Sequence, residues 1–134
     1  MSSIRLLATT VLLIAAPGFA LAQPTFRAER VVSAGKTQKL GYFLALDPTC
    51  HTIGPITINM LSGPHAGRVE VAEGREFPSF VQANARAHCN TRKVAATQLL
   101  YTAPAGYTGE DEFTIERVDP YGAPLQVRYH VTVR

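Results

Sequence analysis

The chain has 134 residues, and its 13 lysines and arginines against 10 aspartates and glutamates give a net charge of +3. So small a basic excess gives no reason to expect a nucleic-acid partner. The length suits one domain with a single hydrophobic core.

The first 22 residues have the layout of a secretory signal peptide. Arg5 precedes a nearly unbroken apolar run over 6–16. Residues 17–22 add a Pro-Gly pair that ends a helix and a small-x-small cleavage motif. The run is too short for a spanning helix, which needs roughly 20 apolar residues. Gln23 stands where a lipoprotein would need cysteine. We therefore expect cleavage after residue 22; an uncleaved N-terminal anchor is the alternative.

Cleavage would leave one mature domain, residues 23–134, that is periplasmic or secreted and has no transmembrane anchor. Its 12 basic and 10 acidic side chains give a net charge of +2. Cys50 and Cys89 are its two cysteines, and two cysteines in an exported chain most often pair. Closing this loop would stabilise the fold by about 4 kcal/mol in the chain-entropy model. A reactive or metal-binding thiol pair is the alternative.

Period-two alternation of apolar and polar residues predicts about seven short strands. They are expected near 26–32 and over 40–46, 56–60, 68–71, 99–102, 113–116 and 127–133. Turn signals rich in Gly and Pro separate them, and no window of the mature part shows sustained helical periodicity. The pattern predicts an all-β fold, an antiparallel β-sandwich that buries one face of each strand. Met60 and Val71 are among the residues expected to face the core.

Residues 74–93 do not fit the strand pattern and are expected to form a long connection with a short strand or a helical turn. Long loops in compact domains are often functional. The segment carries the residues that we select as a partner-binding loop: Arg86, His88, Arg92 and Lys93. A solvated connector that the disulfide holds for stability is an equally good interpretation.

Two motifs resemble bacterial cadherin-like and Ig-like modules. One is Gly63-Pro64-His65-Ala66-Gly67 after an Ile-Thr-Ile run, and the other extends from Tyr101 to Phe113 through Pro104, Gly106, Tyr107, Gly109 and Asp111, with Val131-Thr132-Val133 at the end of the chain. The resemblance covers roughly 55–133 and implies an Ig-like or cadherin-like sandwich, present here as a single copy. It implies no particular activity.

The residues of the second motif can also be explained by the hydrogen bonds that they can make. Tyr107 stands just before a strand, where a tyrosine hydroxyl can hydrogen bond across the corner of a sandwich. Asp111 can accept hydrogen bonds from backbone N–H groups of a tight turn. Both residues therefore favour a structural role.

Metal binding is the alternative function. Calcium needs six to eight oxygen ligands, and the acidic residues available for a weak site are Glu110, Asp111 and Asp119, beside Glu112. His51 and His88 each flank a cysteine, so the disulfide would bring them together as a copper or zinc site. His130 lies on the outward phase of the last strand and is expected to be exposed.

No catalytic residues emerge from the sequence: it has no Gly-x-Ser-x-Gly elbow and no phosphate-cradling glycine loop before a helix. We expect an exported, non-enzymatic binding or structural module without a cofactor. It would act through contacts with a protein or another cell-envelope component. An enzyme of unrecognised type is the last alternative.

Overall fold

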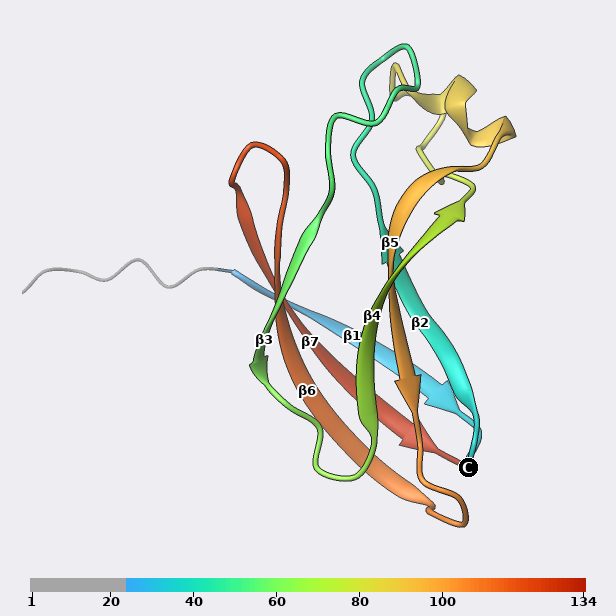
Figure 1. Ribbon diagram of the computed structural model, residues 1–134, viewed down its shortest axis with the longest axis vertical. Helices are drawn as coiled ribbons and strands as arrows, with labels where there is room; N and C mark the ends of the chain where they lie inside the picture. The colour runs from blue at the N-terminus through green and yellow to red at the C-terminus, as the bar shows by residue number, and fades with distance from the viewer. Residues whose placement is uncertain (1–23) are drawn as a thin grey trace, which may run out of the picture.

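A computed structural model describes residues 24–134 (Figure 1), so the predicted signal peptide over 1–22 lies outside the described residues. The strands are β1 (Thr25–Val32), β2 (Thr37–Phe43), β3 (Thr57–Ser62), β4 (Arg68–Glu76), β5 (Val94–Thr102), β6 (Gly109–Val118) and β7 (Pro124–Val133). A 3₁₀ helix, η1 (Ala87–Thr91), lies between β4 and β5. The prediction of an all-β fold with seven strands is confirmed. Within the described range, no helix has the length and apolar character that crossing a bilayer requires.

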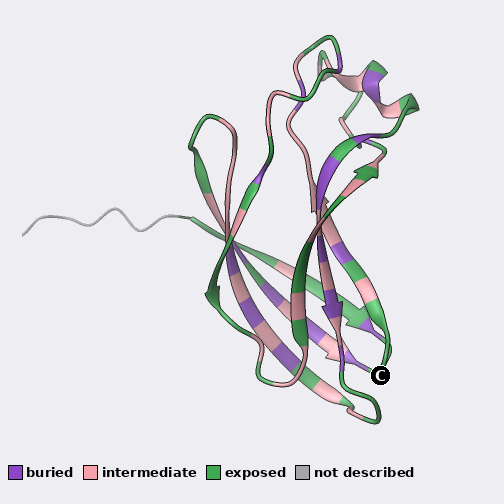
Figure 2. Ribbon diagram, in the orientation of Figure 1, coloured by how far each residue is buried: buried purple, intermediate pink, exposed green. Residues whose placement is uncertain are grey.

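The strands form two sheets that face each other. One sheet has the order β1-β7-β6-β3 and the other β2-β5-β4. The buried residues that pack between them come from both sheets: Leu40, Leu99 and Tyr101 from one, and Phe113, Ile115, Val127, Tyr129, Val131 and Val133 from the other. These positions alternate along their strands, as Figure 2 shows for β6 and β7. The central strands β5, β6 and β7 therefore supply most of the core.

The larger sheet is not wholly antiparallel, which corrects the sequence-based expectation. β1 pairs in parallel with β7, from Thr25 opposite Gln126 to Val32 opposite Val133. The reason is that β1 and β2 belong to different sheets, so β1 does not form a hairpin with its successor. Period-two alternation gives the face of each residue but not the direction of its neighbour strand.

Two predicted core positions are wrong. Met60 of β3 and Val71 of β4 are 43% and 50% exposed. Both strands are sheet edges, where the opposite layer covers the inward face incompletely.

The predicted second strand also ends earlier than expected, at Phe43, while β4 continues to Glu76 through part of the expected connection.

Asp111 joins distant parts of the sandwich near the start of β6. Its carboxylate accepts hydrogen bonds from the backbone N–H groups of His65, Ala66 and Gly67 at 2.7, 3.2 and 2.9 Å. It also accepts the buried Tyr101 hydroxyl at 2.7 Å. Asp111 caps a turn, as predicted, but not the adjacent turn over 104–109 that was expected: the turn it caps lies between β3 and β4, about 45 residues earlier in the chain.

These hydrogen bonds also set the ionisation of Asp111, which is 3% exposed. Burial raises the pKa of the carboxyl, but hydrogen bonds from Gly67, Tyr101 and His65 outweigh it and hold the pKa below its ordinary value. Burial and the Asp111 carboxylate raise the pKa of Tyr101, so its hydroxyl stays a donor. The network is satisfied with Asp111 ionised.

We predict that Asp111→Asn lowers the free energy of unfolding by about 2–4 kcal/mol, because an amide N–H₂ would then face backbone and hydroxyl donors. Urea unfolding at pH 7 measures it. Glu112→Gln, at the neighbouring outward position of the same strand, is the control and should change stability by less than about 0.5 kcal/mol. Equal stabilities for the two variants would contradict the role of Asp111.

The pH dependence follows from the lowered pKa of Asp111. Because the folded pKa lies below the unfolded one, this carboxylate stabilises the fold fully above the unfolded pKa, near pH 4. The stabilisation is lost as the pH falls through the folded pKa. We expect unfolding midpoints measured from pH 6 to pH 2 to fall less steeply for Asp111→Asn than for the parent chain. Parallel curves would show that Asp111 does not carry the acid sensitivity.

Candidate functional site

Two loop segments form a separate small structure at one end of the sandwich, which we call the tip: residues 44–56 and 77–93. Figure 1 shows both beyond the end of the β2-β5-β4 sheet. A disulfide joins Cys50 to Cys89, with their Cα atoms 5.5 Å apart, as predicted. Leu46 and Val94 are buried with the two cysteines in a second apolar cluster, apart from the main core.

Asp47 shapes the turn that delivers Cys50 to the disulfide. Its carboxylate accepts hydrogen bonds from the backbone N–H groups of Thr49 and His51 and from the Thr49 hydroxyl, at 2.7–3.0 Å. These bonds, with Thr49 the largest contributor, hold the pKa of Asp47 below its ordinary value. Cys50 adopts a left-handed backbone conformation (φ 68°), which a non-glycine residue keeps only where its surroundings fix it.

The η1 segment is fastened to the first segment of the tip by side-chain-to-backbone hydrogen bonds. Arg86 Nε donates to the Leu46 carbonyl at 2.5 Å, and Arg92 Nη2 donates to the Thr49 carbonyl at 3.3 Å. Asn90 exchanges two hydrogen bonds with the backbone of Phe80. Arg86 therefore holds the tip together, which is a different role from the partner contact predicted for it.

Basic side chains gather around a cavity of about 300 Å³ on the tip. It is lined by Cys50, His51, Thr52, Arg75, Arg92, Lys93, Val94 and Ala95. The charged residues in this lining are all basic. Two of them, Arg92 and Lys93, belong to the predicted partner-binding loop. The structure thus brings half of that loop together at one surface.

Arg75 and His51 complete this surface. Arg75 is near the end of β4, and its Nη2 donates to the Lys93 carbonyl at 2.6 Å. His51 is exposed, and its Nδ1 lies 2.8 Å from the Thr49 hydroxyl. Arg75 was expected in the connecting segment 74–93 and was not among the residues selected there; it lies at this surface because β4 continues to Glu76.

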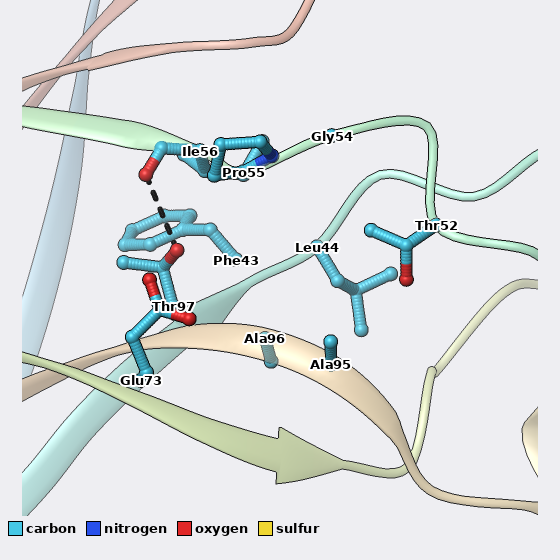
Figure 3. Close-up of a pocket in the computed structure, with 10 residues that line it drawn as sticks. All are labelled: Phe43, Leu44, Thr52, Gly54, Pro55, Ile56, Glu73, Ala95, Ala96 and Thr97. Carbon is cyan, nitrogen blue, oxygen red and sulfur yellow. Dashed lines mark hydrogen bonds between the residues drawn. The ribbon is translucent and has the colours of Figure 1, made fainter.

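Another hollow, of about 210 Å³, is lined by Thr25, Phe26, Arg27 and Arg128, but these two arginines lie 2.8 and 3.9 Å from the carboxylates of Glu29 and Glu112. The cleft in Figure 3, about 30 Å³ between Phe43, Pro55, Ala96 and their neighbours, has room for about one water molecule. The Thr97 hydroxyl crosses it to donate to the Ile56 carbonyl. A second cavity of about 270 Å³ is lined mostly by aromatic and apolar residues, with Arg117 at its edge.

The structure does not gather the predicted calcium ligands. Glu110 and Asp111 are near the start of β6, while Asp119 follows its end; at the usual strand rise, Asp111 and Asp119 are about 26 Å apart. Asp111 is engaged with backbone donors, and Asp119 accepts hydrogen bonds from Tyr121 and Ala123 in the β6–β7 turn. These residues do not form one coordination shell.

Glu110 instead faces His130. His130 Nε2 is 3.2 Å from Glu110, and its Nδ1 is 2.8 Å from Glu29 of β1. The expectation that His130 points outward is correct, but its ring is engaged by carboxylates from both neighbouring strands and is only half-exposed.

Beside the disulfide, the structure groups His88 with the two cysteines, and the His51–His88 metal pair stays a prediction. In residues 24–134, the side chains of Cys50, His88 and Cys89 place their ligand atoms within 4.8 Å of one another, and His51 is outside this group. His88 Nε2 lies 3.8 Å from Cys89 Sγ. Because both sulfurs are bonded in the disulfide, neither is the thiolate that zinc or copper would require.

The Tyr107 hydroxyl donates to the Glu110 carbonyl at 2.8 Å across the corner before β6, as predicted.

No family model matches the sequence, and no curated protein does either. A solved structure described as "Solution Structure of Amebosin" is 10% identical, with a TM-score of 0.41 over 83% of this chain and 99% of that chain. This likeness is too distant to support an inference. The resemblance to cadherin-like and Ig-like modules stays a prediction.

We predict that the double variant Cys50→Ala/Cys89→Ala lowers the free energy of unfolding by about 4 kcal/mol, from the 39-residue loop that the disulfide closes. Amide exchange should accelerate most over residues 44–56 and 77–93, because the main core makes no use of the bond. Uniform acceleration in β5, β6 and β7 would show instead that the tip and the sandwich unfold together.

Proposed function

We propose that this protein is an exported, non-enzymatic binding module that recognises an acidic protein surface in the cell envelope through its tip. The observation that carries the proposal is the gathering of Arg75, Arg92 and Lys93 around one cavity whose lining has no carboxylate. Such a surface attracts acidic partners and speeds their encounter.

The construction of the tip supports a role in recognition. Arg75 and Arg92 each use one N–H to hold a backbone carbonyl, so their positions are fixed before a partner arrives. A surface that is ordered in advance loses less conformational entropy on binding. Phe77, whose ring centroid lies 5.6 Å from Lys93 Nζ, is 50% exposed, and apolar side chains next to charges are typical of contact surfaces.

The Ig-like or cadherin-like assignment belongs to the same proposal. Sandwich modules present their end loops to partners, and the tip is such a set of loops. Export rests on the predicted signal peptide, and the Cys50–Cys89 disulfide is compatible with an oxidising compartment.

We predict that charge reversal in Arg92→Glu/Lys93→Glu abolishes capture of the partner. A photo-crosslinking amino acid at Thr91, which is exposed on the tip, would report contact in cells that export the protein. The cross-linked band should disappear in the variant and weaken with added salt, because screening shortens the range of exposed charges.

The matched control is Arg27→Glu/Arg68→Glu, which makes the same change in net charge on β1 and β4 outside the tip. It should leave the band intact. Equal loss in the control would mean that net charge, and not the tip surface, governs capture. A band that forms with the probe on β1 but not at Thr91 would place the contact elsewhere and overturn the proposal.

A further inference from the structure

The basic cavity of the tip has two walls from different parts of the chain. Cys50, His51 and Thr52 form one wall, and Arg92 to Ala95 form the other, with Arg75 reaching in from β4. The disulfide and the bond from Arg92 to the Thr49 carbonyl hold these walls together. The cavity is therefore a product of the closed tip.

The arginines of this cavity have more N–H donors than they use in hydrogen bonds to the backbone. A guanidinium has five N–H donors, and Arg75 and Arg92 each spend one on a backbone carbonyl. Lys93 lies over the Phe77 ring, with Nζ 5.6 Å from its centroid. Among residues 24–134, the ion pairs involve other cations and not Lys93. The remaining donors are those that bind oxyanions bidentately or in clusters.

Glu76 is the carboxylate that acts on Lys93 electrostatically, but it is engaged elsewhere. Lys39 and Gln98 both donate to it, and the Lys39 contact is the largest cause of its lowered pKa. Glu76 therefore does not neutralise the cavity by itself, and three positive charges are left for a ligand.

We infer that the cavity binds a phosphate group carried by a soluble ester or a lipid headgroup. This inference goes beyond the proposed function, because it assigns the same cavity a phosphate ligand and not an acidic protein surface. Three cations exceed what one carboxylate would balance, whereas a phosphate monoester carries nearly two negative charges and three acceptor oxygens. A cavity of about 300 Å³ has the volume of about ten water molecules, enough for a phosphate and the group that bears it.

The same geometry makes the site dependent on the disulfide. Reduction would release the wall of Cys50, His51 and Thr52 from the wall of Arg92 to Ala95, so the cations would line an open strand end instead of a two-walled cavity, although Arg75 stays hydrogen bonded to the Lys93 carbonyl. Phosphate binding should then be a property of the oxidised protein, lost on reduction while the main core remains folded.

Isothermal titration calorimetry of the oxidised protein with inorganic phosphate and pyrophosphate tests the inference. We expect saturable binding, weakened at least tenfold in Arg92→Gln/Lys93→Gln and within twofold of the parent in Arg27→Gln/Arg68→Gln. Absence of saturable binding by both anions would overturn the inference, as would equal weakening in the two variants.

Two further measurements sharpen the result. Vesicles of phosphatidylcholine with phosphatidic acid, whose headgroup is a phosphate monoester, are compared at equal surface charge with vesicles that carry the diester phosphatidylglycerol. Stronger sedimentation with phosphatidic acid supports the lipid headgroup, and binding of soluble phosphate without it supports the soluble ester. Cys50→Ala/Cys89→Ala, checked for β structure by circular dichroism, should lose phosphate binding. Undiminished binding would overturn the dependence on the disulfide.

The inference and the proposed function fail in different ways. If neither phosphate nor pyrophosphate binds but cross-linking at Thr91 still depends on Arg92 and Lys93, the phosphate site is wrong and the binding module stands. If phosphate binds and cross-linking ignores those charges, the tip is a site for a small anion and the protein-contact proposal falls.

Discussion

The covalent bond between Cys50 and Cys89 is the constraint on which the tip of this molecule depends. The apolar cluster beneath it consists of Leu46, Val94 and the cysteines, with Leu44 and Phe80 at its margin. So few buried side chains cannot by themselves offset the entropy of ordering two loops. The disulfide lowers that entropy in the unfolded chain. Hydrogen bonds that the Asp47 carboxylate accepts and that Arg86 and Asn90 donate then set the detailed shape.

The opposite end of the sandwich solves a similar problem without a covalent bond. There the Asp111 carboxylate gathers backbone N–H groups from the β3–β4 turn and the hydroxyl of Tyr101. Gly67 is required at this point because a Cβ there would stand 2.2 Å from the Tyr101 ring. The Asp111 network closes one end tightly around a buried charge. The disulfide leaves the other end open, with a cavity and unneutralised cations.

Much of the fold was accessible from the sequence, because alternation along β5, β6 and β7 directly reports the faces that these strands bury. The edge strands were harder: Met60 and Val71 obey the same alternation but lie where the opposite sheet ends. The parallel pairing of β1 with β7 was missed because strand direction depends on which sheet receives the next strand, and no local pattern encodes that.

The candidate site was predictable only in part, for a related reason. Cys50, Cys89, Arg92 and Lys93 were found from compartment chemistry and local charge. Arg75 joins them only because β4 continues past the expected strand end and pairs with β5 up to Val94. Asp119 was grouped with Asp111 because the two are close in sequence. An extended strand, however, separates its residues by nearly the largest distance per residue that a chain allows.

The position of β7 has a consequence for how the protein reaches its native state. This strand is central in its sheet and lies between β1 and β6, although it is the last strand in the chain. β1 thus has no neighbour in its sheet until residues about 100 positions later have been synthesised. Such a high contact order slows folding and keeps early segments unpaired during translation. The export that we propose would be compatible with this order of events, because a chain that crosses a membrane has to stay unfolded until it has passed.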